Sequence, residues 1–92
     1  MPEHTIQHNA DRSRFETTVD GQQCVADYRL VGQTMVMTHT YVPPQLEGRG
    51  IAAQLVSAAM DHARENGYKV DPRCSYVAAY MRRHPETQSL HA

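Results

Sequence analysis

The sequence lacks a long run of apolar residues, and its N-terminal stretch MPEHTIQHNADRSRF contains no apolar segment like the core of a secretory signal. No stretch approaches the roughly 20 apolar residues that a membrane-spanning helix needs. We therefore expect a cytoplasmic protein with no membrane partner. The chain of 92 residues also lacks internal repeats and low-complexity linkers, which favours one domain over residues 1–92. Loose ends are expected at 1–12 and 86–92, with an edge strand at 5–8 and light docking of the tail as the alternatives.

Cysteine and excess charge are also scarce. The two cysteines, Cys24 and Cys74, are too few for a disulfide framework in a chain of this size, which favours a reducing compartment. The formal net charge of -1 provides no basic surface for nucleic acid, so no nucleic-acid partner is expected. No metal site is expected either, because no two histidines have ligand spacing with a third ligand nearby. The histidines are His4, His8, His39, His62, His84 and His91.

The first half of the sequence alternates apolar and polar residues, which is typical of strands. We predict strands over residues 14–19, 22–30 and 34–41. Asp20-Gly21 and Gly32-Gln33 supply two tight turns, so the three strands form an antiparallel meander.

The third of these strands ends at Pro43-Pro44, because proline donates no hydrogen bond to a sheet. Strict alternation along this strand places four side chains on one face, namely Met35, Met37, His39 and Tyr41.

The second half changes to a helical period. Apolar residues recur at helical spacing from Ile51 to Ala63, and Gly67 is a left-handed cap. The short strand 68–70 follows a helical crossover and is therefore expected to run parallel to the third strand. A final helix lies within 74–85 and stops at Pro85.

The start of the final helix is open to two interpretations. Asp71-Pro72 can form its cap and first turn, or the strand runs to Cys74 and Ser75 is the cap. In either case the order is β-β-β-α-β-α. This is an α+β domain with a mixed, mostly antiparallel sheet packed by two helices.

The loop before the first helix, PPQLEGRG, is rich in glycine and ends in Gly48 and Gly50. Glycine lets a ligand approach the backbone, and the first amides of a helix have no partner within it. These donors and the helix dipole form an anion site suited to a phosphate or pyrophosphate, with Arg49 adding a charge-assisted contact. The alternative is a tight loop and helix cap. Neither a P-loop nor a dinucleotide fingerprint fits, because no Lys and hydroxyl residue follow Gly50 and residue 53 is Ala.

The segment QLEGRG, Gln45–Gly50, resembles the Gln/Arg-x-x-Gly-x-Gly/Ala signature of the GNAT acyltransferase superfamily. The stretch VPPQLEGRGIAAQLV, followed after one helix by PRCSYVAAYMRRHPE, is similar to the short single-domain GNAT-like N-acetyltransferases. In that group a cysteine follows the penultimate element, as Cys74 does here. The likeness spans about Thr34 to Glu86 and implies a small GNAT-like domain.

The resemblance implies acetyl-CoA as cosubstrate and transfer of its acetyl group to an unidentified amine of a small molecule or protein, by a monomer or weak dimer. The CoA-binding residues it implies are Tyr41, Val42, Pro43, Gln45, Leu46, Glu47, Gly48, Arg49, Gly50, Ile51 and Ala52. Arg82, Arg83 and His84 either contact the 3'-phosphate or adenine or complement the dipole of their own helix. Two alternatives are a CoA-binding or acyl-CoA-binding module without turnover, and a small interaction domain that binds no nucleotide.

Three residues are candidates for catalysis. Cys74 lies at a strand-to-helix junction, where unpaired amides favour a thiolate, so it is an acyl-accepting nucleophile, an acid for departing CoA or a packing residue. Tyr76, or Tyr80 one turn later, is an acid by resemblance or a core residue with a wet hydroxyl. His39 is a base near neutral pH or a packed histidine.

The sequence also departs from the superfamily pattern. Tight turns at Asp20-Gly21 and Gly32-Gln33 leave no room for the two helices that usually separate the first strands. No asparagine follows Asn66, although the last helix of the superfamily often carries one. The acceptor site is therefore expected to be open or to be completed by a partner.

Overall fold

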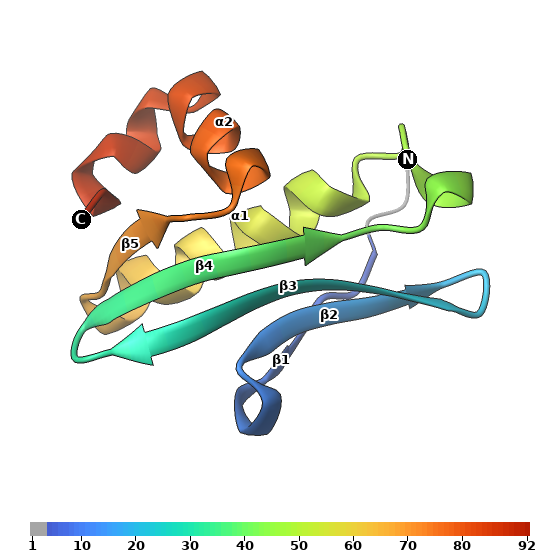
Figure 1. Cartoon of the computed structure of the whole chain (residues 1–92), viewed down its shortest axis with the longest axis horizontal. Coiled ribbons are helices and arrows are strands. Elements are labelled where there is room, and N and C mark those ends of the chain that lie inside the picture. Colours follow the sequence, from blue (N-terminus) through green and yellow to red (C-terminus); the bar gives the residue numbers. More distant parts are fainter. Residues whose placement is uncertain (1–3) are drawn as a thin grey trace.

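The computed structural model describes residues 4–92. Five strands form one sheet in the order β1-β2-β3-β4-β5. The strands are β1 (Gln7–Asn9), β2 (Arg14–Val19), β3 (Gln22–Val31), β4 (Thr34–Tyr41) and β5 (Lys69–Pro72). The two α-helices are α1 (Ile51–Asn66) and α2 (Ser75–Arg83), and the short 3-10 helices are η1 (Ala10–Arg12), η2 (Pro44–Leu46) and η3 (Pro85–Leu90). In Figure 1, α1 lies behind the sheet and α2 follows β5 at one side of it.

The predicted α+β order is confirmed from β2 to α2. The first four strands pair antiparallel with their neighbours, and β5 pairs parallel with β4 after the α1 crossover. At the N-terminal end, β1 is an edge strand at Gln7–Asn9, close to the alternative predicted for residues 5–8. The prediction of a loose N-terminus also covers residues 1–3, which lie outside the described residues.

One hydrophobic core lies between the sheet and α1. Because α1 presents its apolar residues at helical spacing, one face of it is buried along its whole length. The buried residues of this face are Ile51, Leu55, Val56, Ala59, Met60 and Ala63. Opposite them on the sheet lie Cys24, Met35 and Met37, all fully buried. Cys24 is therefore a core residue. No helix among residues 4–92 is long and apolar enough to cross a membrane.

A β-bulge at Thr38 interrupts the alternation of β4. Tyr28 of β3 pairs with Met37. The preceding residue, Asp27, pairs with His39, so Thr38 has no partner of its own on β3. The Thr38 hydroxyl donates a hydrogen bond of 3.4 Å to the Asp27 carbonyl oxygen. One extra residue in a strand turns the side chains that follow it to the opposite face.

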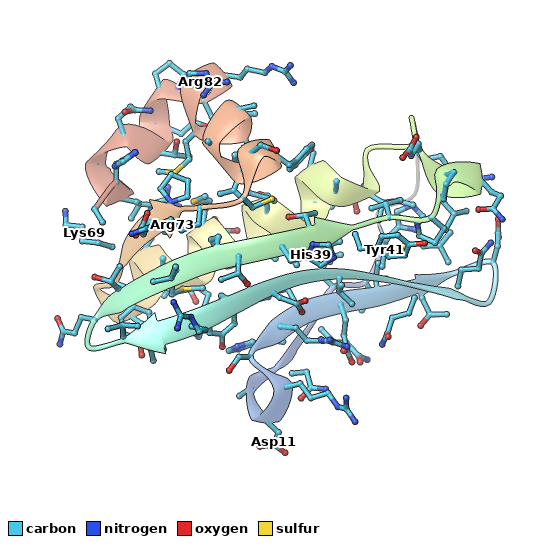
Figure 2. The ribbon with its side chains drawn as sticks, in the orientation of Figure 1. Asp11, His39, Tyr41, Lys69, Arg73 and Arg82 are labelled. Carbon is cyan, nitrogen blue, oxygen red and sulfur yellow. The ribbon has the colours of Figure 1, made fainter. Side chains whose placement is uncertain are left out.

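The bulge corrects the predicted faces of β4. The sequence placed His39 and Tyr41 on the face of Met35 and Met37, and this is wrong. Thr40 takes the core face instead, since it pairs with the fully buried Ala26. His39 and Tyr41 therefore face away from α1, with ring centroids 6.4 Å apart and nearly parallel planes (labelled in Figure 2).

The start of α2 differs from both sequence-based interpretations. Asp71 and Pro72 belong to β5, so they do not begin the helix. The cap is Cys74, one residue before the predicted Ser75. The Cys74 amide donates to the Met37 carbonyl oxygen at 2.9 Å. Backbone hydrogen bonding to β4 therefore continues beyond β5 as far as the cap residue of α2.

The C-terminal segment is packed, which corrects the expected loose end at 86–92. Thr87 and Leu90 of η3 are buried, because the turn at Pro85 folds the chain back across α1 and β5. The Ala92 amide donates to the Val70 carbonyl oxygen at 2.9 Å, and Lys69 Nζ donates to the Ser89 carbonyl oxygen at 2.8 Å. The end of the chain therefore covers the free edge of β5.

Replacing Leu90 with alanine is expected to lower the free energy of unfolding by about 2–3 kcal/mol, because it removes a buried side chain and leaves a cavity. Urea denaturation followed by circular dichroism measures this. Ser89→Ala is the matched control: Ser89 is exposed and contributes only its carbonyl oxygen, so we expect a change within about 0.5 kcal/mol. Equal stability of Leu90→Ala and the parent would mean that η3 contributes nothing to the fold.

Candidate functional site

The glycine-rich loop is anchored on one side and open on the other. Leu46 is buried with 1% of its surface exposed, and this side chain fixes η2 on the core. Gly48 and Gly50 both adopt positive φ, +85° and +78°, and a Cβ added at either would meet nothing within 4 Å. Positive φ is unfavourable for residues with a side chain, so the local conformation requires glycine. The two glycines therefore leave the backbone of the loop open to the approach of a ligand.

The loop leads directly into the amide donors of α1. Gly50 is the N-cap and has no side chain to satisfy them. The first helical hydrogen bond runs from the Gln54 amide to the Gly50 carbonyl oxygen at 3.1 Å. The amides of residues 51–53 consequently have no acceptor within the helix, and they lie at the positive end of the helix dipole. The geometry is that of an anion site.

A cavity of about 530 Å³ opens beside this loop. It forms because β5 pairs with β4 only as far as Met37, whereas β4 continues to Tyr41 while the chain after β5 turns away into α2. Its volume lies within the usual range for small-molecule sites, roughly 300–1,000 Å³. The lining residues are Thr40, Tyr41, Val42, Pro44, Leu46, Glu47, Gly48, Gly50, Ile51, Ala52, Ala53 and Tyr76.

Most of the residues proposed from the sequence for cofactor binding line this cavity. Exceptions are Pro43, Gln45 and Arg49. Pro43 is buried, and its carbonyl oxygen accepts from the Leu46 amide at 2.9 Å, so it shapes the loop. Conversely, Thr40 lines the cavity although the sequence did not point to it. Regular alternation along β4 predicts that Thr40 lies on the opposite face of the sheet. The bulge at Thr38 reverses this and places Thr40 beside the cavity.

Arg49 points away from the cavity. Its guanidinium donates to the Asp20 carboxylate at 3.1 Å, and both side chains are exposed. Asp20 belongs to the β2–β3 turn, so the ion pair joins this hairpin to the glycine-rich loop. An exposed pair of this kind contributes little to stability. The charge that the sequence placed at the pyrophosphate is therefore engaged elsewhere in this structure.

Cys74 lies just behind the cavity lining. Its Sγ is 3.6 Å from Oγ1 of the cavity residue Thr40. Partial burial alone would raise the thiol pKa, but hydrogen bonding from the Val77 amide, the Thr40 hydroxyl, the Tyr76 amide and the Thr40 backbone outweighs it, so the pKa of Cys74 is lowered. The neutral thiol makes no capping hydrogen bond of regular geometry. The amides of α2 therefore act mainly on the ionised sulfur.

Tyr76 reaches the cavity from the first turn of α2 and keeps 36% of its surface exposed. Partial burial and the neighbouring Tyr80 raise the pKa of its hydroxyl, against a smaller opposing effect of Arg83. Tyr76 is therefore protonated at neutral pH and can donate a proton or a hydrogen bond.

Tyr80 and His84 form a packed pair on the same helix. Their rings stack with centroids 3.9 Å apart, and His84 Nδ1 lies 2.8 Å from the Tyr80 carbonyl oxygen. Tyr80 also packs against the hydrophobic core, which favours the packing role for this residue. Neither ring lines the cavity, and nor do the exposed Arg82 and Arg83. Arg82 lies on α2 well away from Tyr41 in Figure 2.

His39 is exposed and does not line the cavity. On the outer face of the sheet it pairs across the strands with Asp27, whose carboxylate accepts a hydrogen bond from Arg14 Nε at 3.1 Å. The structure therefore separates His39 from Cys74, which is on the core side. Within residues 4–92, no three side chains of the His, Cys, Asp and Glu types are arranged to hold a metal ion.

Comparisons with known proteins agree with this geometry. A profile of the GCN5-related N-acetyltransferase family matches residues 14–90. The chain is 35% identical over 88 residues to Protein NATD1 of Xenopus tropicalis, covering 92% of this chain and 81% of the relative. It is 34% identical to Protein NATD1 of Homo sapiens, with 92% and 78% covered.

The fold also matches a solved structure. The solution structure of a GCN5-like protein from Staphylococcus aureus superposes with a TM-score of 0.77 at 24% identity, covering 100% of this chain and 91% of the other. At that identity the match concerns the fold alone. The fold and the loop define a small GNAT-type transferase domain. By its sequence, the chain belongs to the GCN5-related N-acetyltransferase family.

Proposed function

We propose that this protein is an acetyl-CoA-dependent N-acetyltransferase that moves an acetyl group to an amine. The observation that carries the proposal is the continuity of the anion site at Gly48–Ala52 with an apolar cavity that ends beside Cys74 and Tyr76. A CoA thioester needs these features in this order, because a pyrophosphate is followed by a long, weakly polar arm and then by the reactive sulfur.

In this proposal the amides of Gly48–Ile51 bind the pyrophosphate, because those of Leu46 and Glu47 already donate to the Pro43 and Pro44 carbonyl oxygens. The backbone from Tyr41, the last residue of β4, to Pro43 lies along the pantetheine arm. Pro43 cannot donate a hydrogen bond there, and its carbonyl oxygen already accepts from the Leu46 amide. The remaining proposed contacts are those of Gln45, Glu47, Arg49 and Ala52. For Arg49 to reach a phosphate it must exchange its exposed partner Asp20 for the ligand, and the low strength of an exposed pair permits this.

The chemical step is attack of an unprotonated amine on the thioester carbonyl. The new C–N bond forms as the C–S bond breaks, and the amine loses its extra proton. The departing CoA sulfur gains a proton, for which Cys74 and Tyr76 are the two donors at this end of the cavity. His39 can accept the amine's proton only if the acceptor approaches over the outer face of the sheet, where His39 is exposed.

The outer face of the sheet, over which an acceptor would approach His39, is open. Two-residue turns at Asp20-Gly21 and Gly32-Gln33 join β2, β3 and β4, so within residues 4–92 no helix is inserted between these strands. An open face suits an acceptor group on a large molecule as well as a small one. A CoA-binding module without turnover is the second candidate, because Cys74 lies behind the residues that line the cavity and is not one of them.

Acetyl-CoA at a hundredfold excess over its dissociation constant is expected to stabilise the protein by about 2.7 kcal/mol, because it binds the native state alone. Thermal unfolding with and without acetyl-CoA measures this, and ATP provides a control for unspecific anion binding. Thiol release in the presence of a panel of amines then tests turnover. Stabilisation without thiol release favours the binding module, and no stabilisation overturns both.

A further inference from the structure

The bulge in β4 determines which residue of that strand contacts Cys74. Thr38 is the inserted residue, and its hydroxyl is held by the Asp27 carbonyl oxygen at 3.4 Å. Two residues later, Thr40 therefore faces the core side of the sheet, opposite Ala26. Without the inserted residue, Thr40 would face solvent on the other side of the sheet. The bulge is thus the local device that brings a hydroxyl group to the sulfur of Cys74.

The surroundings of this hydroxyl limit what else it can do. Ala26, the cross-strand partner of Thr40, is fully buried and carries no polar side chain. Thr40 Oγ1 lies 3.6 Å from Cys74 Sγ and lines the cavity. A hydroxyl both donates and accepts, so it can accept from a thiol and donate to a thiolate without moving far. The sulfur is thereby held between β4 on one side and the first amides of α2 on the other.

We propose that Thr40 is a positioning residue for Cys74: its hydroxyl fixes the sulfur at the end of the cavity and stabilises its ionised form. This inference rests on the proposed function for its role in transfer, but the contact itself does not require a ligand. When Cys74 gives its proton to the departing CoA sulfur, the Thr40 hydroxyl rotates to donate to the new thiolate. The amides of Tyr76 and Val77 share the charge. Thr40 exchanges no proton, so it acts through Cys74 alone.

The electrostatic surroundings support this role. Burial acts to raise the Cys74 pKa, and four hydrogen-bonding groups lower it: the Val77 amide, the Thr40 hydroxyl, the Tyr76 amide and the Thr40 backbone. No charged side chain among the described residues is one of these causes. Removing the Thr40 hydroxyl while keeping the volume of the side chain should therefore raise the pKa of the Cys74 thiol without changing any ion pair.

The test is the pH dependence of Cys74 alkylation by iodoacetamide in the free protein, read by mass spectrometry so that Cys24 is scored separately. Thr40→Val is expected to raise the apparent pKa by about half to one unit, which slows alkylation at neutral pH roughly three- to tenfold. Thr40→Ser keeps the hydroxyl and should restore most of the parent rate. Thr18→Val, an exposed strand threonine outside the cavity, is the matched control and should change nothing.

Two results would overturn the proposal. The first is a folded Thr40→Val protein with the parent pH profile, and the second is a Thr40→Ser protein as slow as Thr40→Val. Circular dichroism checks the fold, and Thr40→Ala replaces Thr40→Val if the latter does not fold. Because no CoA is present, the outcome is independent of whether the proposed function holds. Protection of Cys74 by added acetyl-CoA, measured in the same assay, tests that function separately.

Discussion

Gly48→Val is expected to weaken acetyl-CoA binding at least about a hundredfold, because a branched side chain would project from the loop into the space proposed for the pyrophosphate. Losing two charge-assisted hydrogen bonds, each worth at least about 1.5 kcal/mol, gives a loss of this size. A Cβ added at Gly48 meets no atom within 4 Å in the free protein. Isothermal titration with CoA and acetyl-CoA measures the change.

The matched control is Gly32→Val. Gly32 lies in the turn between β3 and β4, at the opposite end of β4 from the loop, and it also has positive φ with open space around it. Both variants therefore carry comparable backbone strain, but only Gly48 is in the cavity lining. Parent affinity in Gly48→Val would exclude the loop as the binding site. An equal loss of affinity in Gly32→Val would show that both variants bind acetyl-CoA less well because they are less stable.

The main elements of the fold could be predicted from the sequence because each of them depends on residues that are close together in the chain. Alternation and tight turns define β2, β3 and β4, and Gly67 adopts positive φ as the predicted cap of α1. The loop at Gly48 and Gly50 was also identifiable, since glycine at a strand-to-helix junction has a direct backbone reason. These features depend on residues close together in the chain.

The parts that were mispredicted depend on contacts between distant residues. Nothing near Thr38 in the sequence distinguishes a bulge from a regular strand, and its hydroxyl is held by Asp27 on another strand. The one-residue insertion exchanged the faces of His39 and Thr40. The packing of Leu90 likewise depends on the space left between α1 and β5. Alternation over short segments contains no information about either contact.

The corrected faces of β4 change which of the candidate catalytic residues lie together. Cys74, Thr40 and Tyr76 converge on one end of the cavity, whereas His39 is on the outer face of the sheet. In the proposed reaction the candidate proton donors, Cys74 and Tyr76, and the candidate base, His39, are then on opposite sides of β4. An acceptor amine entering over the outer face would meet His39 before the thioester, and one entering along α2 would meet Tyr76. The Thr40 and Cys74 contact is the same for both routes.

Cys74→Ala is expected to keep acetyl-CoA binding within about threefold while slowing acetyl transfer, because the side chain lies behind the lining and not in the anion site. If Cys74 is a proton donor, the loss is partial, since one acid contributes roughly a hundred- to ten-thousand-fold and water or Tyr76 replaces part of it. We expect this result, with direct transfer from thioester to amine. Steady-state kinetics of thiol release on an accepted amine measure it, with Cys24→Ala as the control at a buried thiol outside the cavity.

An acyl-cysteine route predicts a different set of results. The acetyl group would move to Sγ with release of CoA before the amine arrives, so Cys74→Ala would abolish transfer almost completely. Intact-mass spectrometry of the parent with acetyl-CoA alone would then detect an acetyl adduct on Cys74 that an added amine removes. Tyr76→Phe separates the two routes further: under direct transfer it adds to the loss in Cys74→Ala, because both residues protonate the same sulfur. A chaseable adduct on Cys74 would overturn direct transfer, and with it the assignment of Cys74 as the proton donor.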